Sequence, residues 1–197
     1  MWYSIKQSLL PFIYLIFTAI TAFGIMAIEN MVWLQILLNT LNVALYMVII
    51  TAASYKDGQA ALKVRLANDL EREQIIRTGE MRPLRLKEEY KPWKGFLYGG
   101  IACAPLIILL IIHTILVSIN PTLIGAGAIA SFIYLMIYAY VAFLGVIPGP
   151  YTHYLTLLAV PVIVLSVGIP YILGAKKVEL QQERIREKHR KIYGDNK

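Results

Sequence analysis

The chain has 197 residues, of which 58% are hydrophobic and 16% are charged, and its formal net charge is +7. A soluble domain is typically about 45–50% apolar. Here the apolar residues gather in runs of more than about twenty, the length that crosses a bilayer. This composition excludes an ordinary soluble domain and speaks against nucleic acid as a partner. It predicts an all-α, polytopic membrane protein with four to five transmembrane helices in a lipid bilayer.

Residues 1–55 predict a transmembrane helical hairpin. The first apolar run covers residues 9–28, and the second opens at Trp33 and continues to about Tyr55. Each run has a tryptophan at its start: Trp2 precedes the first run, and Trp33 opens the second. Tryptophan rings settle at the level of the lipid head groups, so we interpret both residues as membrane-interface anchors.

Residues 56–95 form the first of two charged blocks and hold ten Lys or Arg and seven Asp or Glu. The segment 59–78 lacks Gly and Pro and is rich in strong helix formers, so it predicts a helix that Gly79 ends. The segment around Pro83 predicts extended or irregular structure. Trp93 stands just before the next apolar run, which makes it a third predicted interface anchor. We expect this block to be a charged cytoplasmic helical loop.

Residues 96–175 hold three further apolar runs and predict a transmembrane bundle. The runs cover residues 96–119, 123–147 and 154–175. The middle run would place Tyr134, Tyr138 and Tyr140 near the centre of the membrane, whereas tyrosine prefers the head-group zone. We therefore predict that residues 123–147 are re-entrant or lie along the interface. A plain fifth transmembrane helix is the alternative.

The second charged block, residues 176–197, predicts a basic helical tail. The two blocks together hold all nineteen Lys and Arg residues except Lys6. Because cytoplasmic segments carry the excess of Lys and Arg, both blocks are expected in the cytoplasm, and an even number of spans must separate them. The sequence thus predicts a multi-pass protein of the plasma membrane whose charged blocks lie near anionic lipid head groups.

A polar stripe is predicted on the second transmembrane helix. Gln35, Asn39, Asn42 and Tyr46 follow the spacing i, i+4, i+7 and i+11, which places them on one helix face. Two interpretations stay open. The amides either join helices by hydrogen bonds, each contributing about 0.6 kcal/mol, or they line a solute-binding pocket near mid-membrane. In the second case His113, Tyr134 and Tyr138 complete the pocket.

Small residues in the run 123–147 predict close helix packing. Gly127 and Ser131 are four residues apart, and so are Ala126 and Ala130, the spacing at which small side chains let helices approach. Cys103 is the only cysteine of the chain. It rules out a disulfide within one chain, and we interpret it as a small packing residue.

The sequence shows no recognisable catalytic set. It contains no phosphate-binding loop, no His-Glu-x-x-His and no Gly-x-Ser-x-Gly motif. We therefore predict no catalytic residue, no cofactor and no metal ligand. The leading hypothesis is a non-enzymatic accessory or scaffold subunit of a membrane complex, with membrane or cytoplasmic protein partners that dock on residues 59–78 and 178–193. The alternative is a small-solute transporter or substrate-binding membrane subunit.

Overall fold

The protein is all-helical in the computed structural model, which describes residues 2–26, 28, 31–119 and 157–194. These residues form no strand. The helices are α1 (Trp2–Met26), α2 (Val32–Thr78), α3 (Lys94–Ile119) and α5 (Ala159–Tyr193), with the short 3-10 helix η1 (Leu86–Glu88) before α3. The prediction of an all-α fold is confirmed. All four α-helices of the described residues are long and apolar enough to cross a membrane, where backbone polar groups must pair within the helix itself.

The second apolar run and the helix of the first charged block are one continuous element. Helix α2 has 47 residues, which makes it about 70 Å long. The helix does not break where the apolar run ends near Tyr55, but continues through Lys56, Asp57 and Gly58 into the segment 59–78. Its predicted end is confirmed: Gly79 has a φ of 72°, and its N–H donates to the Ile75 carbonyl. Glycine adopts this left-handed conformation at little cost.

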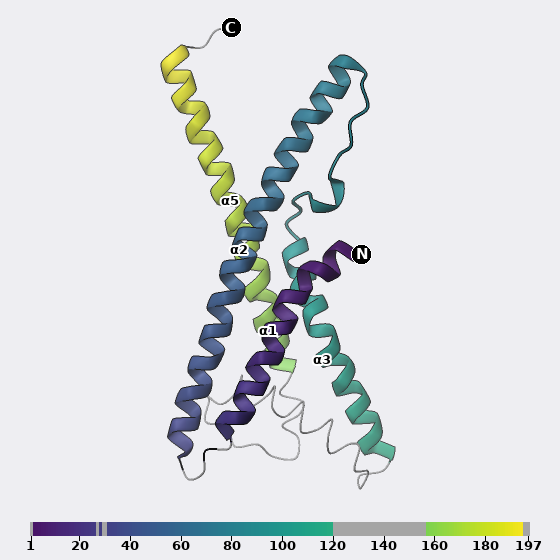
Figure 1. Cartoon of the computed structure of the whole chain (residues 1–197), viewed down its shortest axis with the longest axis vertical. Helices are drawn as coiled ribbons and strands as arrows, with labels where there is room; N and C mark the ends of the chain where they lie inside the picture. Colours follow the sequence, from purple (N-terminus) through teal and green to yellow (C-terminus); the bar gives the residue numbers. More distant parts are fainter. Residues whose placement is uncertain (1, 27, 29–30, 120–156, 195–197) are drawn as a thin grey trace.

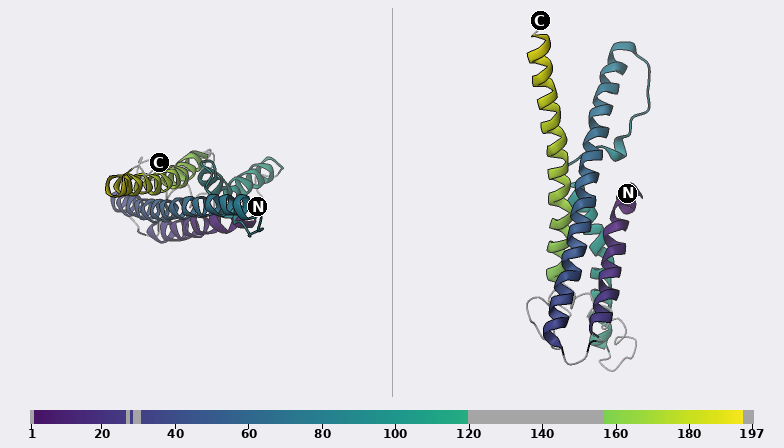
Figure 2. Two further views of the ribbon diagram at one scale, coloured as in Figure 1. Left: turned by 90° about the horizontal axis from the view of Figure 1, so that it is seen from above. Right: turned by 60° about the vertical axis from the view of Figure 1, so that its left-hand side comes forward.

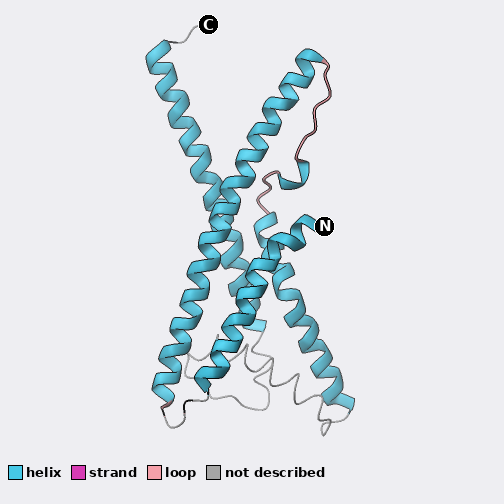
Figure 3. Ribbon diagram, viewed as in Figure 1, coloured by secondary structure: helices cyan, strands magenta, loops and turns pink. Residues whose placement is uncertain are grey.

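The helices alternate in direction, so that both charged blocks lie at one end of the bundle (Figure 1). Helices α1 and α3 run away from that end, and α2 and α5 run toward it and beyond it. We call residues 59–78 the α2 arm and residues 176–193 the α5 arm. The two arms diverge as they leave the bundle, and the turned view in Figure 2 shows the same separation. Figure 3 shows the loop from residue 79 to residue 93, here called the strap, which returns along the α2 arm to the start of α3.

Helices α2 and α5 cross at a close backbone contact built on two glycines. A Cβ atom at Gly58 would lie 1.9 Å from the Tyr171 carbonyl oxygen, and one at Gly174 would lie 2.0 Å from the Tyr55 carbonyl oxygen. No other residue type allows this approach, which is the role of small residues in membrane helix pairs. The Ser54 hydroxyl adds a buried hydrogen bond across the same pair, to the Val167 carbonyl at 2.5 Å.

The apolar core lies at this crossing and on the side of it away from the arms, and it contains residues of α1, α2, α3 and α5. Its buried members include Leu15, Ala19, Ile50, Cys103, Leu106, Ile163 and Tyr171. A smaller cluster of Leu62, Ala175 and Val178 lies just beyond the crossing. Among the described residues, the α5 side of these clusters ends at Val178, which explains why the arms separate there. Large apolar side chains such as Phe17, Leu45 and Ile111 are exposed on the outer faces, as expected of helices that meet lipid.

The predicted fourth apolar run lies outside the described residues. The prediction that residues 123–147 are re-entrant is therefore not tested by the fold, and the same is true of the packing predicted for Ala126, Gly127, Ala130 and Ser131.

Candidate functional site

The amide stripe of α2 lies in the part of the bundle far from the arms, and its side chains donate to backbone carbonyls. Gln35 Nε2 donates to the Ile28 carbonyl at 2.6 Å, and Asn39 Nδ2 donates to the Gln35 carbonyl at 3.2 Å. Asn42 Nδ2 crosses to α1, where the Thr18 carbonyl accepts at 2.9 Å. The last bond is of the interhelical kind that stabilises membrane bundles.

Two members of the stripe, Asn39 and Tyr46, are fully enclosed. The exposed fraction is 0% for Asn39 and 2% for Tyr46. The Asn39 side-chain oxygen accepts no hydrogen bond from any described residue. His113 on α3 is also buried, whereas Tyr134 and Tyr138 lie outside the described residues. The solute pocket that these residues would share therefore stays a prediction.

The three tryptophans occupy the helix starts at the two ends of the bundle. Trp2 begins α1 and Trp93 precedes α3 at the end that carries the arms, and Trp33 lies in the first turn of α2 at the opposite end. Their exposed fractions are 81%, 55% and 67%. The helix rises about 33 Å from Trp33 to Tyr55, close to the ~30 Å of hydrocarbon in a bilayer.

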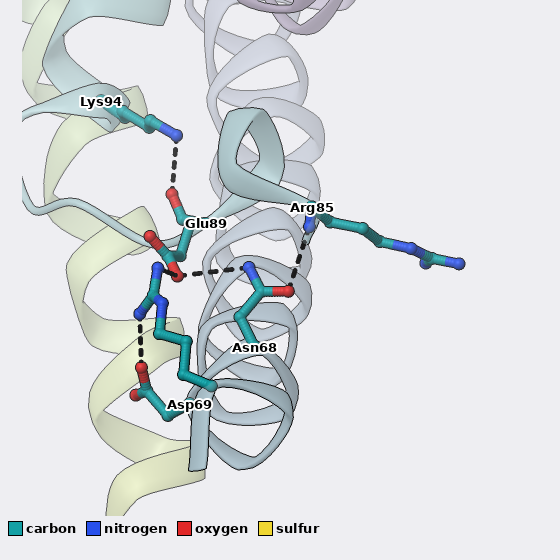
Figure 4. Close-up of polar contacts among 6 residues, drawn as sticks. Asn68, Asp69, Arg85, Glu89 and Lys94 are labelled. Atoms are coloured by element: carbon teal, nitrogen blue, oxygen red, sulfur yellow. Dashed lines mark hydrogen bonds and ion pairs between the residues drawn. The ribbon is translucent and has the colours of Figure 1, made fainter. Parts of the chain in front are cut away.

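A partly buried polar network ties the strap to the α2 arm (Figure 4). Glu89 of the strap receives the Arg72 guanidinium at 2.8 Å and the Asn68 amide at 3.2 Å, both on one carboxylate oxygen. Arg72 also pairs with Asp69 at 2.7 Å. The Asn68 carbonyl oxygen accepts the backbone N–H of Arg85 at 3.1 Å. Because Asn68 is only 4% exposed, both ends of its amide need these partners.

Lys94, the first residue of α3, closes the other end of the strap. Its ammonium donates to the backbone carbonyls of Lys87 at 3.0 Å and Glu89 at 2.6 Å. Lys94 is itself buried, so these carbonyls replace the water that a lysine normally keeps. The strap is thus held along its length by side chains from α2 and α3.

A tyrosine cluster that sequence reasoning missed packs the strap against the bundle. Tyr90 stacks on Tyr171 with ring centroids 5.5 Å apart, and Tyr98 meets the same ring edge-on at 5.9 Å. The Tyr90 N–H donates to the Ala61 carbonyl. Burial raises the pKa of Tyr90, and the nearby Glu179 carboxylate raises it further against the opposing effect of Arg65. The phenol therefore stays neutral and acts in packing.

An open groove lies between the two arms, and we call it the inter-arm groove. Its volume is about 500 Å³, and its walls are Leu66, Asp69, Leu70 and Glu73 on α2 and Gln182, Ile185 and Arg186 on α5. Leu70 and Ile185 are 63% and 59% exposed. Apolar side chains therefore line a groove whose α2 wall is acidic and whose α5 wall is basic.

A second pocket lies between the α2 arm and the strap and has a volume of about 490 Å³. It collects the cations Lys63, Arg82 and Arg85, with Glu71 as the acidic member. Arg82 is paired with Glu71 at 3.5 Å, so part of this positive charge is already neutralised.

The arrangement supports binding more directly than it supports catalysis. Within the described ranges, no three His, Cys, Asp or Glu side chains gather where they would hold a metal ion. The apolar residues within the charged arms are the sequence signal that could have indicated the inter-arm groove. The sequence alone does not show that the two arms lie next to each other. Comparison of the chain with known protein families, with curated proteins and with solved structures gives no match.

Proposed function

We propose that this chain is a non-enzymatic docking subunit of a membrane complex, anchored in the plasma membrane by its helical bundle. The observation that carries the proposal is the inter-arm groove. Two membrane helices continue past the bundle as arms and leave apolar side chains exposed between them. Such surface on water-facing helices marks an interaction site.

The orientation follows from charge. The arms and the strap carry 15 of the 19 Lys and Arg residues of the chain and lie at one end of the bundle (Figure 1). By the positive-inside rule, we place this end in the cytoplasm. The partner is then a cytoplasmic protein or the cytoplasmic part of a membrane protein, and anionic lipid head groups flank the site.

The shape and charge of the groove favour an amphipathic helix as the docked element. Such a helix buries an apolar stripe in a groove between two others. Asp69 and Glu73 on one wall would face its basic edge, and Arg186 on the other wall would face its acidic edge. Charge arranged in this way sets the direction in which the helix docks.

The test compares aspartate substitutions inside and outside the groove. Leu70→Asp and Ile185→Asp place a charge on the groove walls, whereas Ile76→Asp changes a side chain that is 83% exposed and lies outside the groove lining. We expect a partner recovered by photocrosslinking in native membranes to be lost with the first two variants and retained with the third. Equal recovery with all three variants would refute the docking role of the groove.

A second candidate, a small-solute site in the membrane, is favoured by Asn39. This side chain is 0% exposed, and its oxygen accepts no hydrogen bond from the described residues, although a buried acceptor normally has a partner. A polar solute would supply one. A thermal-shift screen of small polar solutes tests this: Asn39→Leu should abolish any shift, and a shift that survives Asn39→Leu together with Asn42→Leu would rule the site out.

A further inference from the structure

A shallow groove on the outer face of the α2–α5 pair has the anatomy of a phospholipid site. It has a volume of about 580 Å³ and lies on the same two helices as the crossing, away from the inter-arm groove. Its main lining residues are Val48, Ala52, Lys56 and Gln59 on α2, and Pro170 and Leu173 on α5. We call it the lipid groove.

The lining changes from apolar to polar along the helix axes. On α2, Val48 and Ala52 come before Lys56 and Gln59, and on α5, Pro170 and Leu173 come before Lys177. Both helices run in the same direction (Figure 1), so the apolar residues of both face the membrane side and the cations of both lie at the arm side. A phospholipid has the same order, with its apolar acyl chain toward the membrane interior and its charged head group toward the surface.

Two lysines mark the polar end of the lipid groove. Lys56 is part of its lining, and the Lys177 ammonium lies 5.7 Å from the centre of the Tyr55 ring, which also lines the groove. An aromatic ring under an ammonium steadies the charge without neutralising it. The lining of the groove contains no acidic residue. A phosphate therefore meets positive charge, and no carboxylate of the lining, at this end.

The polar end also lies at the level expected for head groups. Tyr55 and Lys56 stand where the apolar run of α2 ends, and the Tyr55 carbonyl faces Gly174, three residues before Lys177. From Val48 to Ala52 the helix rises about 6 Å, enough to contact the part of an acyl chain next to the head group. The two helices thus offer one apolar channel with one cationic mouth.

We propose that the lipid groove binds one anionic phospholipid, with its phosphate near Lys56 and Lys177 and an acyl chain along Val48, Ala52 and Leu173. The proposal rests on the membrane placement of the bundle and is independent of docking between the arms.

Native mass spectrometry of the full chain, released from nanodiscs that contain equal phosphatidylglycerol and phosphatidylcholine, tests the proposal. We expect about one retained phosphatidylglycerol per chain. Each lysine near an anionic head group contributes roughly fivefold to affinity, so Lys56→Gln with Lys177→Gln should weaken retention about 25-fold. The matched control, Lys63→Gln with Lys188→Gln, removes the same charge outside the groove and should retain the lipid.

A second variant pair needs no change in charge. Ala52→Phe fills the apolar part of the lipid groove, and Ala44→Phe places the same ring at another exposed position of α2 outside the lining. We expect lipid loss with the first variant alone. Equal loss in both lysine pairs, equal retention of the zwitterionic lipid, or displacement of the lipid by millimolar glycerol phosphate would each overturn the proposal. The last result would assign the lysines to a soluble anion.

Discussion

Replacing Gly174 by alanine should open the crossing of α2 and α5. The new Cβ atom would lie 2.0 Å from the Tyr55 carbonyl oxygen, and contacts below 3.0 Å do not persist, so the two backbones must separate by about 1 Å. Overpacking of this kind costs about 1–3 kcal/mol, and alanine returns about 1 kcal/mol of helix propensity. Because the clash is with backbone, which cannot rotate away, we expect a net loss of about 2 kcal/mol.

Gly100→Ala is the matched control, because a Cβ atom at Gly100 meets nothing within 4 Å. This change keeps the gain in helix propensity and should stabilise the protein by up to about 1 kcal/mol. Gly58→Ala should resemble Gly174→Ala, since its Cβ atom would lie 1.9 Å from the Tyr171 carbonyl oxygen. The double variant Gly58→Ala with Gly174→Ala should cost less than the two single changes added together, because one separation relieves both clashes.

The native cysteine provides the assay. Cys103 is the only cysteine of the chain and is fully buried in the core, so a thiol-reactive fluorescent dye reports unfolding in detergent without any label being introduced. A loss of 2 kcal/mol should lower the melting temperature by about 4–8 °C in a chain of this size. If Gly174→Ala and Gly58→Ala melt at or above the temperature of Gly100→Ala, the close crossing is refuted.

Three further substitutions test local contacts. Ser54→Ala should cost about 0.6 kcal/mol, because it removes a hydrogen bond across the crossing; Thr51→Ala, which removes bonds within α2 only, is its control. Glu89→Gln should speed hydrogen exchange in the strap by up to about fivefold, since the Arg72 pair is partly exposed; unchanged exchange would contradict the role of the network. Gly79→Ala should fray the last turn of α2 at a cost of about 1 kcal/mol, seen as faster exchange near Ile75.

The features that the sequence predicted are those that depend on neighbouring residues. The first, second and third apolar runs correspond to helices because an apolar segment long enough to cross a bilayer must pair its backbone polar groups internally, which a helix does. The end of α2 at Gly79 was predictable because the left-handed cap needs only one residue of the right type. The continuity of α2 past Tyr55 was not predicted, and it has a physical reason: strong helix formers follow the apolar run, so the helix does not break where charged residues begin.

The candidate site could be predicted only in part, because its contacts join distant residues. Glu89 and Arg72 are 17 residues apart, and Ser54 and Val167 are 113 apart. The spacing of Asn39 and Asn42 showed that they share a helix face, but not that Asn42 reaches the Thr18 carbonyl on α1. The stacking of Tyr171 on Tyr90 was not predicted, because an aromatic residue in an apolar run has no local sequence signature of stacking.

The unbroken course of α2 has a mechanical consequence. Gly58 lies 26 residues from the start of the helix and 20 from its end, about 39 Å and 30 Å along the axis. A rod without a joint at the membrane surface turns as a whole, so a displacement of 1 Å at its far end becomes about 0.8 Å at the arm tip in the opposite direction. Helix α5 crosses α2 at the glycine contact, so the two helices can rotate relative to each other about that point. The width of the inter-arm groove is thereby linked to how the helices pack in the lipid.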